Sequence, residues 1–427
     1  MATGKTPRDG TPGTPGTPGA AGTPGATGAT GATATQSQRP ALQPQPPATT
    51  RAGDIERPAT GAGDIERPAT VAEALRWGAR VIGGGPYTHM DDQLARNEAE
   101  WLLGWVAGWN RTTLLVSLPD GISDEVWERF WEAIQRRVNG EPLQYITGEA
   151  AFFGRSFHVE PGCLIPRPET ELLAEAAITY IRSGHAGWSH GGSGHAGTGH
   201  AGTDLADFAH LQRIAGAIQP TPIVRVADIG TGSGALAVTI ALECPSASVW
   251  AVDLSAKALR IAGANATALG AAESVTFVQD DGIEWLASLT SATGAPDEAV
   301  PSQRGVAPDE AVPPAIHVPN GLHILVSNPP YIPSEDIQAL DADVRDHEPR
   351  LALDGGSDGL DFYRSLAALG QGVFAPGPAA LFLEVGFGQA QDVKALFAAT
   401  NADFVGWTFD VLRDLQGIER VVRGVRS

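Results

Sequence analysis

Val326-Ser327-Asn328-Pro329-Pro330-Tyr331 is the stretch of sequence that decides the fold. The apolar residues 324–326 at its start predict a buried strand of a parallel sheet. The two prolines prevent further strand pairing and an immediate helix, so a rigid loop follows the strand. Open α/β sheets bind their ligands at this carboxyl edge.

The side chains of this loop suit a planar amide or amino group. Asn328 offers a side-chain carbonyl, Pro329 offers its backbone carbonyl, and Tyr331 adds a flat aromatic face. Two acceptors match the two hydrogens of an –NH2 group, and the ring can stack on its plane. We therefore predict that Asn328, Pro329, Pro330 and Tyr331 form a catalytic site that alkylates such a nitrogen.

A strand–loop–helix–strand unit lies upstream of this loop. Residues 223–229 predict a strand, Asp228-Ile229-Gly230-Thr231-Gly232-Ser233-Gly234 a glycine-rich loop, and 235–242 a helix. Short apolar runs predict further strands at 247–252, 275–278, 324–326 and 380–385, and a closing edge strand at 420–425. This order of elements predicts a doubly wound α/β sheet.

The glycine-rich loop predicts a nucleotide-like ligand. Its glycines let the backbone approach closely, and Asp253 at the next strand end can accept hydrogen bonds from both hydroxyls of a ribose. A nicotinamide dehydrogenase shares these features. However, acids at three positions (Asp228, Asp253 and Asp281) suit a cation better than a pyrophosphate. They favour S-adenosylmethionine, with its sulfonium and ammonium charges, although Asp228 could instead brace the loop.

Composition limits the possible partners and compartment. The 427 residues include 49 acidic and 29 basic side chains, a net charge of −20, without a basic run. This balance argues against direct nucleic-acid binding. Cys163 and Cys244 have no metal-ligand spacing and suggest a reducing compartment. No apolar run approaches membrane-spanning length, so we expect a cytoplasmic protein without membrane contact.

Three segments have low-complexity composition. We expect residues 1–70, with glycine at every third position between Gly10 and Gly31, to be a disordered tail. Flexible insertions are expected at 183–220 and 291–320. Histidines recur every five residues from His185 to His200, and such a tract can bind metal. This period matches neither helix nor strand, so we predict no metal site.

The remaining chain divides into three parts. Residues 71–140 predict a small helical domain rich in tryptophan, whose tryptophans either form its core or present an aromatic face to a protein partner. Residues 141–163 predict a hairpin linker, and 164–427 the α/β domain. Near its start, Thr170 could cap a helix and Arg167 could bind a carboxylate or phosphate, unless this segment is a plain turn. The tryptophans singled out here are Trp101, Trp105, Trp109, Trp127 and Trp131.

With these residues in view, the chain resembles the class I methyltransferases, and closely the release-factor glutamine N5-methyltransferase family (PrmC/HemK). Asn-Pro-Pro-Tyr alone is shared with adenine-N6 methyltransferases, whereas Pro166-Arg167-Pro168-Glu169-Thr170-Glu171 and the helical domain are more specific. The likeness spans about 71–426 except the insertions. Its motifs lie at 141–148, 165–171, 228–234, 328–331, 348–353, 358–360 and 414–420.

The resemblance implies a seven-stranded Rossmann-like sheet and S-adenosylmethionine-dependent methylation of a glutamine side-chain amide. The substrate would be the Gly-Gly-Gln loop of class 1 peptide-chain release factors. Apart from the resemblance, we expect a monomer. Asn328 to Tyr331 and Arg167 would contact substrate, while Asp281 and Gly282 would border the adenine. Gly282 departs from the family, which often has a bulkier residue there. The other implied cofactor contacts are Asp228, Gly230, Thr231, Gly232, Ser233, Gly234, Asp253 and Asn328.

Two rival functions remain open at this point. An adenine-N6 or other exocyclic-amine nucleic-acid methyltransferase would use the same loop, but would need a basic recognition region. A non-catalytic module would dock a partner through the helical domain while its cofactor fold is vestigial. Retention on heparin would favour the first rival, and the absence of heat on titration with S-adenosylmethionine would favour the second.

Overall fold

A computed structural model describes residues 67–85, 87, 90–184, 223–291, 318–399 and 403–427. Residues 1–66, the histidine tract and residues 292–317 of the second predicted insertion lie outside this description. Val318 already belongs to the buried core, so the second insertion ends earlier than predicted. Within the described residues, no helix has the length and apolar character needed to cross a membrane.

Four helices follow one another in the N-terminal part: α1 (Val71–Gly83), α2 (Asp92–Ala107), α3 (Arg111–Val116) and α4 (Asp124–Val138). Each begins after a residue whose side chain accepts a hydrogen bond from a backbone N–H of the first turn. These caps are Thr70, Asp91, Asn110 and Ser123. The helices enclose their own apolar core, in the region where the sequence predicts a bundle.

The tryptophans of this region do not share one environment. Trp127 is buried and packs edge-on against Trp77, whereas Trp109 and Trp131 are partly buried. Trp101 and Trp105 are 56% and 38% exposed. Core packing therefore accounts for Trp127 but not for Trp101 and Trp105, which lie on the exposed face of α2.

The linker contains the predicted hairpin, formed by β1 (Glu149–Phe152) and β2 (Arg155–His158). Its two-residue turn, Phe153-Gly154, has positive φ at both positions, as tight hairpins require. A short helix, α5 (Leu143–Thr147), precedes it and was not predicted. Ile146 of α5 belongs to the core of the N-terminal helices.

Seven strands form the main sheet in the order β5-β4-β3-β6-β7-β9-β8. The strands β3 to β7 run parallel, while β9 pairs antiparallel with both β7 and β8. The predicted edge strand at 420–425 is β9, which lies inside the sheet; the edge is β8, which was not predicted. The bounds are β3 (Val224–Ile229), β4 (Ala247–Asp253), β5 (Val275–Gln279), β6 (Ile324–Ser327), β7 (Ala379–Glu384), β8 (Trp407–Arg413) and β9 (Glu419–Arg426).

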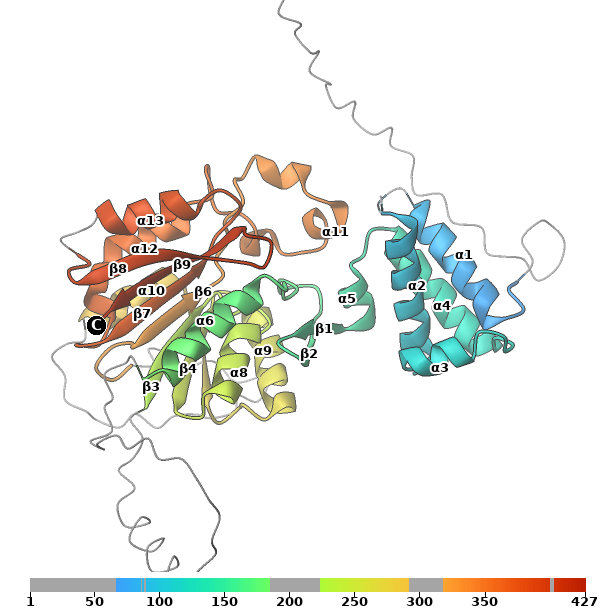
Figure 1. The fold of residues 1–427 in the computed structure, drawn as a ribbon, viewed down its shortest axis with the longest axis horizontal. Helices are drawn as coiled ribbons and strands as arrows, with labels where there is room; N and C mark the ends of the chain where they lie inside the picture. Colours follow the sequence, from blue (N-terminus) through green and yellow to red (C-terminus); the bar gives the residue numbers. More distant parts are fainter. Residues whose placement is uncertain (1–66, 86, 88–89, 185–222, 292–317, 400–402) are drawn as a thin grey trace, which may run out of the picture. The chain divides into compact units, whose positions relative to one another are not determined.

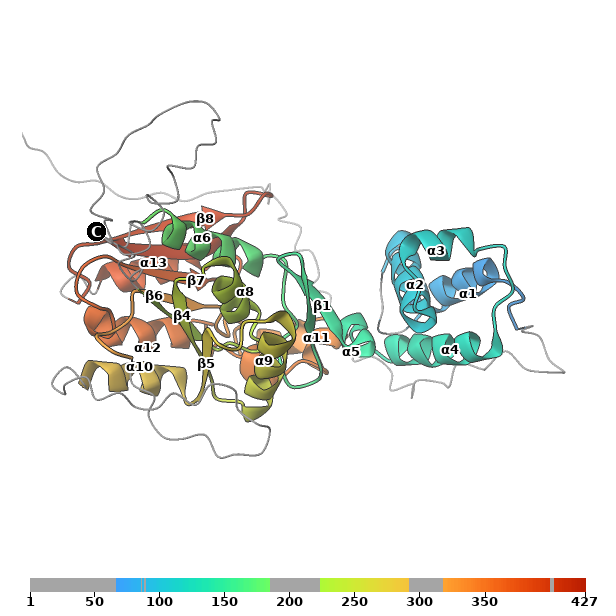
Figure 2. The same cartoon turned by 90° about the horizontal axis from the view of Figure 1, so that it is seen from below.

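Helices cover both faces of this sheet (Figures 1 and 2). One apolar core lies under α6 (Thr170–Arg182), α8 (Ala235–Glu243) and α9 (Ala256–Leu269). The other lies under α10 (Gly282–Ser291), α12 (Asp361–Leu369) and α13 (Ala390–Ala399). This two-sided burial explains why the parallel strands are continuous apolar runs. Short helices complete the description: η1 (Asp336–Ala339), α11 (Ala342–Arg345), η2 (Arg350–Ala352) and η3 (Gly370–Val373).

Candidate active site

The parallel register brings the predicted site residues to one edge of the sheet. Ile229, the last residue of β3, pairs with Val252 of β4 and Ser327 of β6. The glycine-rich loop, Asp253 and Asn328 follow these three residues directly, so they lie at the same level. In the sheet, β4 lies on one side of β3 and β6 lies on the other. The order of the strands therefore reverses at β3, which makes its carboxyl end a topological switch point.

The glycine-rich loop has a backbone that only glycine adopts easily. Gly230, Gly232 and Gly234 have φ values of 73°, 57° and 80°. A Cβ atom on Gly230 or Gly232 would meet nothing within 4 Å, so open space lies over the loop. A Cβ atom on Gly234 would stand 2.9 Å from the Cβ of Ala262, because this glycine lets α8 pack closely on α9.

Asp228 braces the loop and keeps one oxygen unused. Its Oδ2 accepts hydrogen bonds from the Thr231 hydroxyl at 2.7 Å and the Ala237 N–H at 3.1 Å. Its Oδ1 is buried and has no hydrogen-bond partner among the described residues. Burial raises the pKa of Asp228 to about 7, against the opposing effect of the two hydrogen bonds. Asp228 therefore braces the loop, the alternative that the sequence left open, and its second oxygen is buried without a hydrogen-bond partner among the described residues.

Asp253 ties the glycine-rich loop to the end of β4. Its Oδ2 accepts from the Gly232 N–H at 2.9 Å and its Oδ1 from the Ser255 N–H at 2.8 Å. Burial raises the pKa of Asp253, and both hydrogen bonds oppose that shift. Each carboxylate oxygen has further lone pairs, so the side chain can still accept from a ligand's hydroxyls.

Asp281 and Gly282 open helix α10. The Oδ1 atom of Asp281 accepts from the N–H groups of Ile283 and Glu284, at 2.9 and 3.1 Å. A Cβ atom on Gly282 would stand 2.3 Å from the Ile229 side chain at the end of β3. The absence of a side chain at Gly282 therefore allows close packing against Ile229 of β3.

Asn328 is held by a residue from a distant helix. Its Nδ2 donates to the hydroxyl of Thr170, the first residue of α6, at 3.0 Å. With Nδ2 occupied, Oδ1 is the end of the amide left to accept hydrogen bonds from a ligand. The prediction that Thr170 caps α6 is wrong, because the cap position is Glu169 and no side chain caps this helix.

Sequence reasoning missed the role of Glu384 at this edge. Leu383 of β7 pairs with Ser327 of β6, so the next residues, Glu384 and Asn328, lie at the same level. Glu384 is 2% exposed, and burial raises its pKa to about 7, although a hydrogen bond from Thr170 opposes the shift. The signal was an acidic residue that ends an otherwise apolar strand.

The loop after Asn328 is held in place by neighbouring side chains and by the backbone at Gly359. The Tyr331 carbonyl accepts from Nε2 of Gln389 at 2.9 Å, and its hydroxyl lies 3.5 Å from Oε1 of Glu384. A Cβ atom on Gly359 would collide with the Tyr331 carbonyl at 2.2 Å. Burial raises the pKa of Tyr331, so the phenol stays neutral. Pro329 is buried and Pro330 partly buried, consistent with a fixed loop.

Arg167 is already paired in this structure. Its guanidinium donates to Oε1 of Glu348 at 2.5 Å, and the Glu348 side chain is 1% exposed. Burial raises the pKa of Glu348, and Arg167 is the main opposing influence. The guanidinium therefore meets a carboxylate, as the sequence predicts, and that carboxylate is the buried one of Glu348; its contact with substrate stays a prediction.

These residues fit the predicted cofactor. Gly230 and Gly232 leave a space that a side chain would fill, and Asp228 keeps a buried oxygen without a partner. Asp253 offers acceptors at the next strand end. Such a set suits a nucleoside that carries a positive charge. Within the ranges that the structure describes, no group of three His, Cys, Asp or Glu side chains could hold a metal ion.

Comparison with known proteins agrees with this geometry. Residues 73–148 match the family described as the PrmC N-terminal domain, and 226–293 match a methyltransferase domain. The sheet order, the glycine-rich loop and the Asn-Pro-Pro-Tyr loop define a class I methyltransferase.

Relatives that match this chain over most of their length identify a family within this class. The release factor glutamine methyltransferase of Moorella thermoacetica is 38% identical, over 72% of this chain and 84% of the relative. That of Bacillus cereus is 34% identical, over 82% of this chain and 98% of the relative. This chain belongs to the release factor glutamine methyltransferase family. A solved protein-(glutamine-N5) methyltransferase from Alicyclobacillus acidocaldarius is 31% identical over 64% of this chain and 99% of its own, with a TM-score of 0.32.

Proposed function

We propose that this protein transfers a methyl group from S-adenosylmethionine to the side-chain amide nitrogen of the glutamine in the Gly-Gly-Gln loop of peptide-chain release factors. The observation that carries the proposal is the orientation of the Asn328 side-chain amide. Its Nδ2 is engaged by Thr170, so Oδ1 is presented as an acceptor at the sheet edge that also bears the glycine-rich loop. Membership of the release factor glutamine methyltransferase family supports the choice of substrate.

The chemical problem is that an amide nitrogen is a poor nucleophile, because its lone pair is delocalised into the carbonyl. Oδ1 of Asn328 and the carbonyl of Pro329 would accept the two N–H groups, which orients the nitrogen and increases its electron density. Tyr331 would fix the plane of the amide. S-adenosylmethionine supplies an activated methyl group when bound. No strong base is required beforehand, so the residues serve to hold and orient.

The cofactor would be held by the glycine-rich loop and its acids. Gly230 and Gly232 would admit the ligand, Asp253 would accept from hydroxyls, and Asp228 would face the positive charge. Asp281 and Gly282, which follow β5, would border the adenine. This assignment predicts that cofactor affinity depends on the strand ends and that turnover depends on the Asn328 loop.

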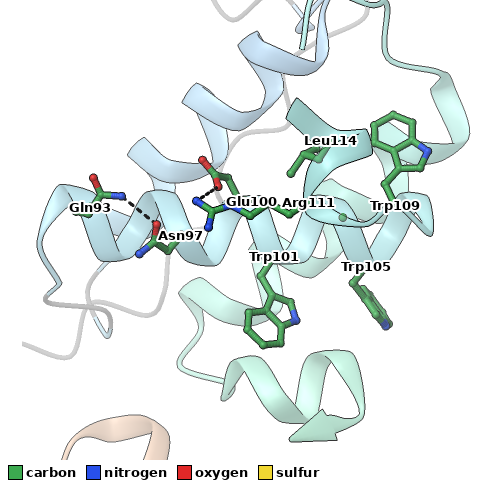
Figure 3. Close-up of a pocket in the computed structure, with 9 residues that line it drawn as sticks. Gln93, Asn97, Glu100, Trp101, Trp105, Trp109, Arg111 and Leu114 are labelled. Atoms are coloured by element: carbon green, nitrogen blue, oxygen red, sulfur yellow. Dashed lines mark hydrogen bonds and ion pairs between the residues drawn. The ribbon is translucent and has the colours of Figure 1, made fainter. Parts of the chain in front are cut away.

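The N-terminal helices supply a surface for a protein substrate. A pocket of about 760 Å³ lies along α2 and α3, and it is lined by apolar and polar side chains. Figure 3 shows Trp101 and Trp105 projecting from the same side of α2, while Arg111 pairs with Glu100. Exposed tryptophans beside polar groups are typical of protein-binding surfaces. The lining residues are Gln93, Asn97, Glu100, Trp101, Gly104, Trp105, Trp109, Arg111 and Leu114.

The test is mass spectrometry of a purified release factor after incubation with this protein and S-adenosylmethionine. We expect a gain of one methyl group on the glutamine of the Gly-Gly-Gln loop. A release factor with alanine at that glutamine should stay unmodified. Methyl transfer to adenine in an oligonucleotide, with none to the release factor, would instead establish the nucleic-acid rival.

A further inference from the structure

The backbone of Tyr331 decides where its ring lies, and this ring is the part of the loop that would fix the plane of a substrate amide. A Cβ atom on Gly386 would stand 3.0 Å from Cδ2 of the ring, so the ring edge lies close to the backbone that follows β7. The Tyr331 hydroxyl adds little support, since it lies 3.5 Å from Oε1 of Glu384. The position of the ring therefore depends on what holds the Tyr331 backbone.

A side chain outside the loop holds the Tyr331 carbonyl. Nε2 of Gln389 donates to this carbonyl at 2.9 Å, and Oε1 of the same side chain accepts from the Gly386 N–H at 2.9 Å. Nε2 also lies 3.5 Å from the carbonyl of Asp358. A single carboxamide therefore joins the Asn-Pro-Pro-Tyr loop to the turn after β7 and to the segment before α12.

The two ends of the Gln389 carboxamide are not interchangeable. A backbone N–H only donates and a backbone carbonyl only accepts, so turning the amide over would set donor against donor at Gly386 and acceptor against acceptor at Tyr331. The Gln389 backbone is fixed as well, because its N–H donates to the Gly386 carbonyl at 3.1 Å and its carbonyl accepts from the Val393 N–H at 2.9 Å. The contact with Tyr331 therefore starts from the fixed beginning of α13.

We propose that Gln389 is a positioning residue for methyl transfer: it holds the Tyr331 carbonyl, and through that backbone it sets the plane of the ring against the substrate amide. Gln389 acts through Tyr331 and not on the reacting atoms. The inference rests on the proposed function for its substrate. It goes beyond that function by assigning a role to a residue that lies 58 positions from Tyr331, outside the residues proposed to contact substrate or cofactor.

Two substitutions at Gln389 separate its contacts. Q389M keeps a side chain of similar length and loses both hydrogen bonds, whereas Q389E keeps an acceptor for the Gly386 N–H but sets an oxygen against the Tyr331 carbonyl. We expect both variants to lower kcat on a purified release factor at least about tenfold, because a small displacement of an orienting group costs much of the rate. KM for the release factor and the affinity for S-adenosylmethionine, measured by isothermal titration, should change less than about twofold.

Gln391 supplies the matched control, because it lies in the first turn of α13 and its hydrogen bond does not involve the loop. Its Nε2 donates to Oε1 of Glu419 on β9 at 3.1 Å. Q391M removes a hydrogen bond of the same kind and should keep kcat within about twofold of the wild type. Equal losses in Q389M and Q391M, or a kcat of Q389E within about twofold of the wild type, would overturn the inference. If Q389M does not fold, Q389E decides.

A readout without substrate distinguishes this inference from the proposed function. In nuclear magnetic resonance spectra, the signal of the Tyr331 carbonyl carbon should move in Q389M and Q389E and stay in place in Q391M, because its hydrogen bond is lost only in the first two. The Gly386 N–H should exchange with water faster than in the wild type in Q389M but not in Q389E. An unchanged Tyr331 signal in Q389E would overturn the inference. If the signals behave as expected but the wild type methylates no release factor, the proposed function fails and the contact between Gln389 and Tyr331 stands.

Discussion

We expect kcat to depend strongly on the side chain of Asn328. Replacing it with alanine removes the acceptor for the substrate amide but leaves the glycine-rich loop and Asp253 in place. We expect N328A to lower kcat by about 10²–10³-fold, the usual cost of losing one aligned polar partner in an active site. Affinity for S-adenosylmethionine, measured by isothermal titration, should change less than threefold. Equal loss of turnover and cofactor affinity would instead indicate a binding role only.

Asp228 makes the stability of the cofactor-free protein depend on pH. Its pKa rises from 3.8 in the ordinary carboxyl to about 7 through burial. Between about pH 4 and 7 the unfolded chain releases this proton while the folded chain keeps it. The free energy of unfolding therefore falls as pH rises through that window, by up to about 1.4 kcal/mol per pH unit.

Urea unfolding of wild type and D228N at pH 5 and pH 8 checks this expectation. The variant cannot titrate at this position, so its loss of stability from pH 5 to pH 8 should be smaller. Glu384 contributes a slope of the same sign in both proteins, because its pKa is also raised to about 7. Parallel profiles for the two proteins would show that Asp228 does not titrate in this range.

The limits of sequence reasoning at this scale follow from distance along the chain. The glycine-rich loop and Asn328 can be recognised from the local sequence, and the structure brings them together as predicted. Thr170 and Asn328 are 158 positions apart, and Arg167 and Glu348 are 181 apart. No local pattern reports such a contact. The sequence therefore predicts a cap at Thr170 and a carboxylate or phosphate beside Arg167, but it identifies neither Asn328 nor Glu348 as the partner.

At the scale of elements, Asn265 of α9 joins the hairpin to the glycine-rich loop. Its Oδ1 accepts from the His158 N–H at 2.8 Å, and its Nδ2 donates to the carbonyls of His158 and Ser233, both at 2.9 Å. We expect N265A to lower the free energy of unfolding by about 2–4 kcal/mol, because three polar backbone atoms lose their partner. Affinity for S-adenosylmethionine should fall as well, since Ser233 belongs to the loop.

The matched variant is N265D, which keeps the acceptor for His158 but loses both donors. It should also destabilise the protein and weaken cofactor binding, because the Ser233 carbonyl is still unpaired. Chemical denaturation and isothermal titration provide the two measurements. If N265A binds cofactor as tightly as wild type, the hairpin contact does not support the loop.

Element type was easier to predict than element position. The parallel strands β4, β6 and β7 are almost wholly buried and read as short apolar runs, whereas β3 and β5 include polar or partly exposed residues. β9 alternates because Val422 packs into one core and Val421 into the other, so its pattern resembles that of an edge strand although it lies inside the sheet. The edge strand beside β9 is β8, which has mixed burial and alternates apolar and polar residues from Trp407 to Val411, a pattern that sequence reasoning missed.

At the scale of the whole molecule, the exposed tryptophans predict separate tasks for the helical region and the sheet. Trp101 and Trp105 project from α2 into one pocket, and neither belongs to the apolar core (Figure 3). We expect the double variant W101A/W105A to lower kcat/KM on a full-length release factor by about 10–100-fold, as loss of an aromatic anchor does. Stability should change little, because both side chains are exposed.

A short Gly-Gly-Gln peptide supplies the decisive comparison, since it can occupy the Asn328 loop without reaching a second surface. Its kcat/KM should be the same for wild type and W101A/W105A, and so should the affinity for S-adenosylmethionine. V116A is the control, because Val116 lies in the same region, is 73% exposed and does not line the pocket. If kcat/KM falls equally on peptide and protein, the tryptophans contribute to the stability of the enzyme and do not dock the substrate. If kcat/KM falls on neither, the release factor docks on another surface.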